Sequence, residues 1–465
     1  MPEKYHIHCE PAAPRIRPEG KLGIVDWRED CAGCHNCVKK GCVYHLYRDE
    51  ADALYSERGY LDYIFQCKGC LVCVQNCTKN ILTRVANPEF ERLGDDYFTP
   101  DMMLATWFQA ETGSIPVSGC GYGGPFSGKG FDSMWTDMSE IVRPTRDGIH
   151  GREYINTAVD IGRKLHHLSF DGDALRVAPP PILTTPLPLM FEAIPERWRR
   201  GPVLDALVSA AARLGLFAIV REREARTLPD AVRHSVIPLL DDAGRDDGFS
   251  NAPMVMAPDG PDVLAKVARL KAANPKRLVG IRVPAAPEAA RRAVALAAGG
   301  VEVVDLLFDE HGREAAPSEP RHARDVLRDV HGALLKAGIR DEMTLMASRG
   351  IALAEHMAKA IICGADLVAI DTPLIVALEC RLCGECARGE CCPIQLEEID
   401  PKYAARRVTN LMGAWHSQLL EMMGAMGIRE ARRLRGEVGR CMFFEDLERQ
   451  AFGRIFGKRK VASKA

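Results

Sequence analysis

The feature that most constrains the fold is an alternation of short apolar runs with helical patterns between residues 181 and 371. Eight runs have the length and composition of buried strands; they are 182–185, 217–220, 236–240, 253–257, 278–283, 301–308, 344–347 and 367–370. Helical patterns lie at 203–215, 224–234, 261–273, 287–299, 322–337 and 353–364. This alternation predicts a (β/α)8 barrel, in which the third crossover is too short for a full helix.

The last strand–helix unit leads directly into a cysteine motif. Its five cysteines, which precede Pro393, are Cys380, Cys383, Cys386, Cys391 and Cys392. In such barrels the loops after strands seven and eight commonly bind a phosphate group. A phosphate-bearing cofactor at that place would lie close to an iron–sulfur cluster held by these cysteines. The arrangement therefore predicts an electron-transferring flavoprotein.

Two further cysteine sets stand near the N-terminus, with three cysteines at x2 spacing followed by a fourth. They are Cys31, Cys34, Cys37 and Cys42, and then Cys67, Cys70, Cys73 and Cys77. Each triplet can hold three corners of a cubane while the fourth ligand comes from the other set. The spacing predicts one [4Fe–4S] cluster on the first triplet with Cys77 and a second on the other triplet with Cys42. A pair of zinc sites is the alternative.

The length of 465 residues allows two or three domains. We predict an N-terminal arm at 1–24, a two-cluster ferredoxin-like domain at 25–87 and a Gly/Pro-rich wrapping segment at 88–180. The barrel occupies 181–379, the iron–sulfur motif 380–395 and a C-terminal helical extension 396–465. The fold class is therefore α/β, with a small iron–sulfur domain in front of the barrel.

Composition narrows the classes of partner and compartment. The net charge of −2 gives no reason to expect nucleic acid or an anionic membrane as partner. No apolar run is long enough to span a bilayer, and no apolar signal core stands at the N-terminus. Of the 17 cysteines, 13 fall into the three clusters above, which favours metal ligation over disulfides. These observations predict a cytoplasmic, oxygen-sensitive protein.

With the barrel pattern and the cysteines, the chain resembles the FMN-binding large-subunit domain of glutamate synthase. The resemblance is closest to the archaeal-type form, which carries a two-cluster ferredoxin domain ahead of the barrel. It rests on 347–351, 362–370, 380–393 and 406–410. It implies that Ser348, Gly350 and Thr372 contact the FMN phosphate. It also implies that Cys380, Cys383 and Cys386, with Cys391 or Cys392, hold a third cluster of the [4Fe–4S] or [3Fe–4S] type.

Several positions depart from the family pattern. Arg349 stands where the family has a glycine; it could neutralise phosphate, at the cost of strain if the turn needs positive φ. The segment 189–194 replaces the family's motif after the first strand, and 309–312 replaces a glycine-rich loop. Arg282 is the candidate substitute for a family lysine and, with His311, a candidate catalytic residue. A structural pair with Asp305 and a solvent-facing loop histidine are the respective alternatives.

We therefore expect a glutamate synthase-like oxidoreductase that passes electrons from ferredoxin-type clusters to FMN and reduces an imine or 2-oxo acid. The alternative is a flavin-free subunit that relays electrons through three clusters to a partner enzyme. Position 2 is Pro2 rather than a nucleophilic cysteine, so ammonia would have to come from a glutaminase-type partner. We expect the chain to be one subunit of a larger complex, together with an electron-donor subunit.

Overall fold

The computed structural model describes residues 4–16, 34, 36, 71–81, 88–115, 117–118, 121–122, 128–136, 154–164, 169–176, 179–241, 248–315 and 318–457. Five of the predicted N-terminal ligands, Cys31, Cys37, Cys42, Cys67 and Cys70, lie outside the described residues, as does most of the predicted ferredoxin-like domain. The predicted domain boundaries stay predictions.

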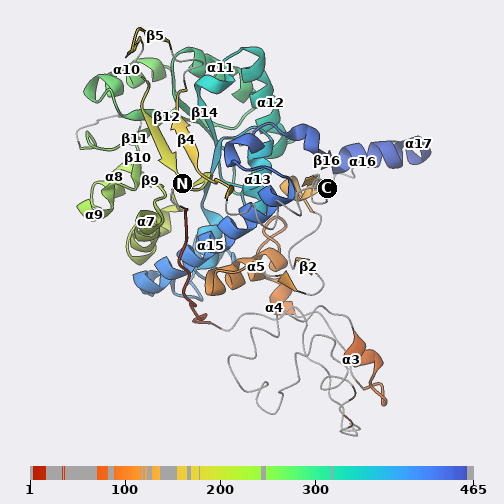
Figure 1. The fold of residues 1–465 in the computed structure, drawn as a ribbon. Coiled ribbons are helices and arrows are strands. Elements are labelled where there is room, and N and C mark those ends of the chain that lie inside the picture. The colour runs from red at the N-terminus through yellow and green to blue at the C-terminus, as the bar shows by residue number, and fades with distance from the viewer. Residues whose placement is uncertain are drawn as a thin grey trace.

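A closed barrel of eight parallel strands forms the centre of the protein (Figure 1). Its strands are β8 (Leu189–Phe191), β9 (Ala218–Arg221), β10 (Val236–Leu239), β11 (Met254–Pro258), β12 (Leu278–Pro284), β13 (Val303–Leu307), β14 (Thr344–Ser348) and β15 (Leu367–Ile370). The ring closes where β15 and β9 each pair in parallel with β8. The predicted (β/α)8 barrel is confirmed.

The prediction of the first barrel strand was wrong. Residues Ile182–Thr185 form β7, which pairs antiparallel with β4 (Val159–Gly162) outside the barrel. Ile182 is 50% exposed, whereas all three residues of β8 are buried, as a barrel strand covered on both faces requires. The segment 189–194, expected to be the loop after the first strand, thus contains the strand itself.

Helices cover the outside of the barrel, largely where the sequence predicts them. They are α7 (Pro202–Leu214), α10 (Val263–Ala273), α11 (Ala289–Ala298), α12 (Ala323–Lys336) and α13 (Ala354–Ile362). Pro202 suits the first turn of α7, and Gly215 ends that helix with a φ of 65°. The helix predicted at 224–234 is two short helices, α8 (Glu222–Ala225) and α9 (Asp230–Arg233), because Pro229 cannot continue a helix. The described part of the third crossover contains no helix.

The C-terminal extension is largely helical. It follows α14 (Thr372–Ala377) and contains the long helix α15 (Pro401–Ala425). Asp400 caps the N-terminus of α15, because its side chain accepts hydrogen bonds from the backbone N–H groups of Lys402 and Tyr403. Helix α15 packs against α7 and against α5 (Pro100–Thr112). Strand β16 (Cys441–Phe443) then pairs with β3 (Met134–Thr136), and α16 (Phe444–Ala451) and α17 (Gly453–Phe456) follow.

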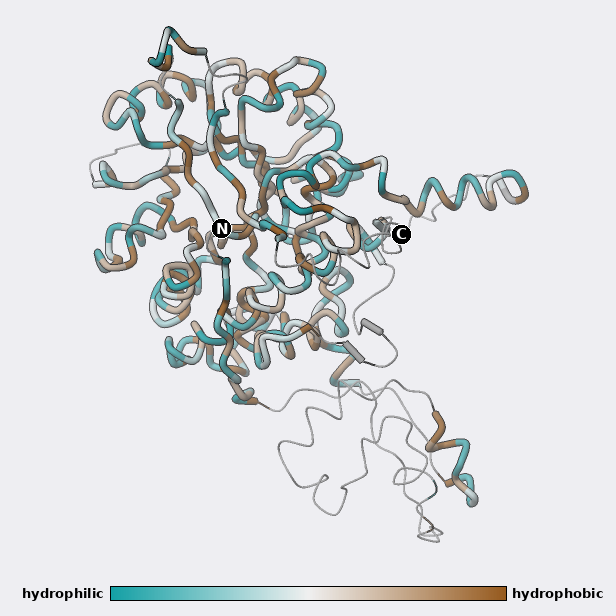
Figure 2. The backbone as a smooth tube through the Cα atoms, viewed as in Figure 1, coloured by the Kyte–Doolittle hydropathy of each residue, from teal (hydrophilic) through white to brown (hydrophobic). Residues whose placement is uncertain are grey.

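Helices α16 and α17 project away from the barrel (Figure 1), and hydrophilic and hydrophobic residues alternate along them in Figure 2. The described short elements are α3 (Val72–Gln75), α4 (Pro88–Glu91), β1 (Val117–Ser118), β2 (Gly121–Tyr122), β5 (Phe170–Asp171) and β6 (Ala174–Leu175). Within the described ranges, we find no helix with the length and apolar character to cross a membrane.

One buried arginine joins four segments of this assembly. Arg407 on α15 is fully buried and donates to the backbone carbonyls of Ala377 on α14, Ala12 in the N-terminal arm and Trp107 on α5, at 2.6, 3.0 and 3.3 Å. A buried carbonyl that loses its donor costs free energy because water cannot replace the bond. Arg407 therefore holds the arm, α5 and α14 together.

We predict that Arg407→Met lowers the free energy of unfolding by about 3 kcal/mol, since it leaves these buried carbonyls without a donor. Urea unfolding followed by circular dichroism measures the change. The matched control is Arg406→Met, because Arg406 is 44% exposed and pairs with Glu10 at the surface; we expect a change within about 0.5 kcal/mol there. Equal losses in the two variants would contradict the assigned role of Arg407.

Candidate functional site

Charged side chains fill the mouth of the barrel, where the strands end. Arg282 on β12 is 7% exposed, and its Nη1 and Nη2 donate to the carboxylate of Glu192 at 2.8 and 2.6 Å. Its Nε donates to Asp305 on β13 at 2.6 Å. Burial works to lower the pKa of Arg282, but the two carboxylates outweigh it and raise that pKa, so the guanidinium stays charged. The pairing of Arg282 with Asp305 matches the structural alternative.

Ser348, at the end of β14, belongs to the same buried group. Its hydroxyl donates to Asp305 Oδ1 at 2.6 Å, and the residue is fully buried. Burial raises the pKa of Asp305, while Arg282 and the Ser348 hydroxyl oppose that rise. The Ser348 side chain, predicted to contact phosphate, is therefore engaged inside the barrel. We call Glu192, Arg282, Asp305 and Ser348 the mouth network.

The turn after β14 has the strained backbone that an arginine in a glycine position implies. Arg349 and Gly350 have φ angles of 74° and 69°, both in the left-handed region. At Gly350 a side chain would collide with the next loop, since a Cβ would lie 2.1 Å from the Cα of Gly312. The Tyr97 hydroxyl donates to the carbonyl of Gly350 at 2.6 Å. The turn is thus held in place by Tyr97, a residue from outside the barrel.

Asp371 occupies the place at which the sequence predicts a phosphate. It caps α14 by accepting from the backbone N–H of Thr372 at 2.6 Å, and its other oxygen lies 3.3 Å from Arg349 Nε. Burial raises the pKa of Asp371 to about 6, with Arg349 opposing. The Thr372 N–H is therefore already satisfied by an anion, and a phosphate would have to displace or neutralise Asp371.

Two arginines at the mouth nevertheless have buried N–H groups that make no hydrogen bond within the described part of the chain, although Asp371 Oδ2 lies 3.3 Å from one of them, Arg349 Nε. Nε of Arg221, at the end of β9, and Nε of Arg349 have no hydrogen-bond partner among the described residues. Burial lowers the pKa of Arg221, and the neighbouring charges of Arg199 and Arg282 add to that effect. Buried N–H groups without acceptors cost free energy, so this edge of the mouth suits an anionic group.

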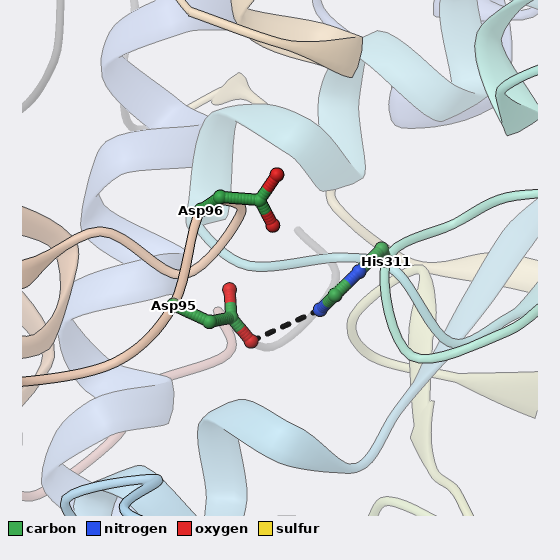
Figure 3. A group of neighbouring side chains, drawn as sticks. All are labelled: Asp95, Asp96 and His311. Atoms are coloured by element: carbon green, nitrogen blue, oxygen red, sulfur yellow. Dashed lines mark hydrogen bonds and ion pairs between the residues drawn. The ribbon is translucent and has the colours of Figure 1, made fainter. Parts of the chain in front are cut away.

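His311, the other candidate catalytic residue, pairs with Asp95 instead of a member of the mouth network. Its Nε2 lies 2.9 Å from Asp95 Oδ2, and Asp96 is beside them (Figure 3). These three side chains could hold a metal ion by distance alone. However, Asp96 pairs with Lys129, and Asp95 also accepts from the backbone of Tyr97 and Phe98. These contacts form an ion-pair network, which holds segment 95–98 against the loop after β13.

The cysteine loop follows α14 and returns against the barrel. Cys392 is 6% exposed and packs in the core, whereas Cys391 is exposed. The charges of Cys392, Cys386 and Cys383 all act on Cys380, whose thiol pKa burial raises to about 12. Among the five cysteines of this loop, Cys391 is the exposed one and Cys392 the buried one.

The backbone of this loop is wound unusually tightly. Positive φ angles occur at Glu379, Leu382, Gly384, Gly389 and Gln395. Glu379, Leu382 and Gln395 are not glycines, so their left-handed conformation costs strain that a bound group can offset. The donor set and the winding both fit a cluster with four thiolate ligands.

Comparison with known proteins finds similar sequences. Residues 244–429 match the sequence family described as the conserved region in glutamate synthase. Archaeal-type glutamate synthase [NADPH] of Dehalococcoides mccartyi is 26% identical over 89% of this chain and 93% of its own. Archaeal glutamate synthase [NADPH] of Archaeoglobus fulgidus is 24% identical over 92% of this chain and 96% of its own. The chain is therefore similar to the glutamate synthase family over its barrel and its C-terminal part.

A shorter match has a higher identity: archaeal glutamate synthase [NADPH] of Methanocaldococcus jannaschii is 35% identical over 35% of this chain and 34% of its own. Among solved structures, a mandelate oxidase variant with an FMN adduct has a TM-score of 0.38 at 16% identity, covering 62% of this chain and 90% of that chain. A flavocytochrome b2 variant with pyruvate bound has a TM-score of 0.40 at 12% identity, covering 71% and 87%.

The mouth contains three charged residues that sequence reasoning missed as site residues. They are Glu192, Arg221 and Asp371, each at or directly after the end of a barrel strand. That position was the available signal, because the C-terminal strand ends carry the functional side chains of such barrels. Glu192 escaped notice because the first strand was assigned seven residues too early.

We predict that Asp371 makes the stability of this protein fall as the pH rises from about 4 to about 6. The pKa of Asp371 in the folded state, about 6, lies above its value in the unfolded chain, so the folded state binds more protons in that window. The free energy of unfolding therefore falls by roughly 2–3 kcal/mol across it. The difference in unfolding free energy between wild type and Asp371→Asn, measured by urea titration at several pH values, should fall accordingly.

The control for this pH dependence is Asp366→Asn. Asp366 is also buried, but Arg340 and Arg435 outweigh burial and lower its pKa. Its stabilisation is present above pH about 4 and is lost only below that, so the wild-type difference should be flat across the same window. A flat difference for Asp371→Asn as well would contradict the elevated pKa of Asp371.

Proposed function

We propose that this protein is an iron–sulfur flavoprotein oxidoreductase of the glutamate synthase type that binds FMN at the barrel mouth. The observation that carries the proposal is the buried Nε–H of Arg221, which has no hydrogen-bond partner among the described residues, together with that of Arg349, which makes no hydrogen bond there either and lies 3.3 Å from the Asp371 carboxylate. Both arginines lie at the ends of barrel strands, and the cysteine loop follows the last strand of the same barrel. Relatives that span nearly the whole chain are named glutamate synthase [NADPH], which supports this reaction class.

In this proposal Arg349, at the turn after β14, binds the phosphate and is oriented by Asp371. The left-handed turn at Arg349 and Gly350 is held rigid by Tyr97 and Gly312, which supports a fixed binding geometry. Because Asp371 has a raised pKa, a nearby phosphate would favour its neutral form and reduce the repulsion between the two groups. FMN supplies two-electron chemistry, and the clusters supply one-electron transfer.

The chain's own groups at the mouth also suit an acidic substrate. Arg221 offers a buried cationic donor, and the mouth network excludes water from the centre of the barrel. We propose that the substrate is a 2-oxo acid or the corresponding imine, whose carboxylate would bind a guanidinium group. His311 lies on the outer rim in its pair with Asp95 and stays a prediction as a proton donor.

The N-terminal clusters form part of the same proposal. The Cys34 sulfur lies 3.6 Å from the hydroxyl of Thr78, the residue after Cys77. Cys34 and Cys77 are predicted to bind one cluster, so this approach of two segments 44 positions apart supports the crossed ligand pattern. We further propose that a partner subunit delivers electrons from NADPH and that another supplies ammonia.

A flavin-free electron relay is the second candidate, and one observation favours it. The Ser348 hydroxyl and the Thr372 N–H, both expected to contact phosphate, are satisfied by Asp305 and Asp371 instead. A barrel whose phosphate donors are all used internally would support a scaffold role, with the clusters as its redox groups.

Cofactor counting separates the two candidates. Anaerobically purified protein should contain about one FMN and roughly eleven or twelve irons per chain, as two cubanes and a third cluster require. The measurement combines flavin absorbance after acid release with iron and acid-labile sulfide assays on one sample. Full iron without flavin, even after added FMN, would establish the relay and exclude the flavoenzyme.

Neighbouring cysteines provide a matched pair of variants for the third cluster. We expect Cys392→Ser to lose or convert that cluster, because Cys392 is buried and its charge acts on Cys380. Cys391→Ser should keep wild-type iron content, because Cys391 is exposed. Iron counts and low-temperature EPR spectra measure both effects. The reverse result would assign Cys391 as the fourth ligand.

A further inference from the structure

Arg197 connects the barrel mouth to the cysteine loop. It lies five residues after Glu192, in the short 3-10 helix Glu196–Trp198 of the loop that follows β8. Its Nη1 donates to the backbone carbonyl of Cys386 at 3.0 Å. Its guanidinium also lies 5.1 Å from the centre of the Trp198 ring, and that tryptophan is buried. The side chain is therefore held in place between the two segments.

A carboxylate from the far end of the cysteine loop completes this contact. Glu397 Oε1 accepts from Arg197 Nε at 2.9 Å and also from Nη2. Arg197 thus bonds to residues on both sides of Cys392, since Cys386 precedes it and Glu397 follows it. The hydrogen bond with Glu397 raises the pKa of Arg197, and the neighbouring sulfurs of Cys386 and Cys392 add to that effect.

The position of this charge has a consequence for a cluster bound by the loop. Reduction adds one electron, and so one negative charge, without breaking a bond. A nearby positive charge stabilises the reduced form and raises the reduction potential, and a negative charge does the opposite. The charge of Arg197 interacts with Cys386 and Cys392. Arg197 and its partner Glu397 place one charge of each sign at the cysteine loop, so the potential depends on both.

We propose that Arg197 is a positioning residue for the C-terminal iron–sulfur cluster and, together with Glu397, sets its reduction potential. The proposal rests on the proposed function, because it needs a cluster on Cys380, Cys383, Cys386 and Cys392. It goes further in naming the residues that orient the ligand loop from the barrel side. Arg197 thereby ties the position of the cluster to the loop that also carries Glu192 of the mouth network.

The test is an EPR-monitored redox titration of the anaerobically purified full chain, with dithionite as reductant. Arg197→Met should shift the C-terminal cluster to a more negative potential, corresponding to a several-fold weaker reduction equilibrium. Glu397→Gln should shift it in the positive direction, and Arg197→Lys should fall between Arg197→Met and wild type. Since Arg197 is 34% exposed, the shifts should shrink at high salt.

Arg200→Met is the matched control. Arg200 lies in the same loop, is 64% exposed and pairs with Glu224 instead of the cysteine loop. Its variant should keep the wild-type potential. Loosening of the loop alone would move Arg197→Met and Glu397→Gln in the same direction, because both lose the same contact, and that result would overturn the electrostatic role.

Iron and sulfide counts on every sample distinguish a missing cluster from a cluster whose potential does not depend on Arg197 and Glu397. A wild-type chain without a C-terminal cluster signal would overturn the proposed function and this inference together. A wild-type cluster whose potential is the same in Arg197→Met and Glu397→Gln would overturn this inference alone.

Discussion

The buried charge of Arg282 is the constraint on which the barrel mouth depends. A guanidinium inside a hydrophobic barrel is tolerated only when its charge and its donors are satisfied, and Glu192 and Asp305 do both. Removing one partner of such a group costs about 3–5 kcal/mol, because it leaves a buried charge unpaired. With Ser348 attached to Asp305, the network joins β12, β13, β14 and the chain end of β8.

A filled centre moves ligand binding toward the rim of the mouth. The Nε–H groups of Arg221 and Arg349, which make no hydrogen bond among the described residues, lie at the strand ends around the network. The turn that carries Arg349 is supported by Tyr97, which comes from the segment before the barrel. The cysteine loop lies on the same rim, joined through Arg197 to the loop that begins at Glu192. The segment after β8 thus connects the mouth network, through Glu192, to the cysteine loop, through Arg197.

Most of the barrel could be predicted from sequence because strand and helix periodicity is a local property. Seven of the eight barrel strands were placed correctly, and the failure was equally local. Residues 182–185 and 189–191 are both short apolar runs flanked by prolines, and only the burial of the second run distinguishes them. The strained Arg349 was also foreseen, since a family glycine indicates a position that needs positive φ.

The sequence by itself determined the barrel, its order of elements and the cysteines that could bind clusters, because periodicity and ligand spacing are written in neighbouring residues. Only the tertiary structure decided how the charges pair. Arg282 meets Glu192 across 90 positions, and Arg197 meets Cys386 across 189. It also decided that Cys392 is buried while Cys391 is exposed. These outcomes depend on packing between distant segments, and no local pattern contains that information.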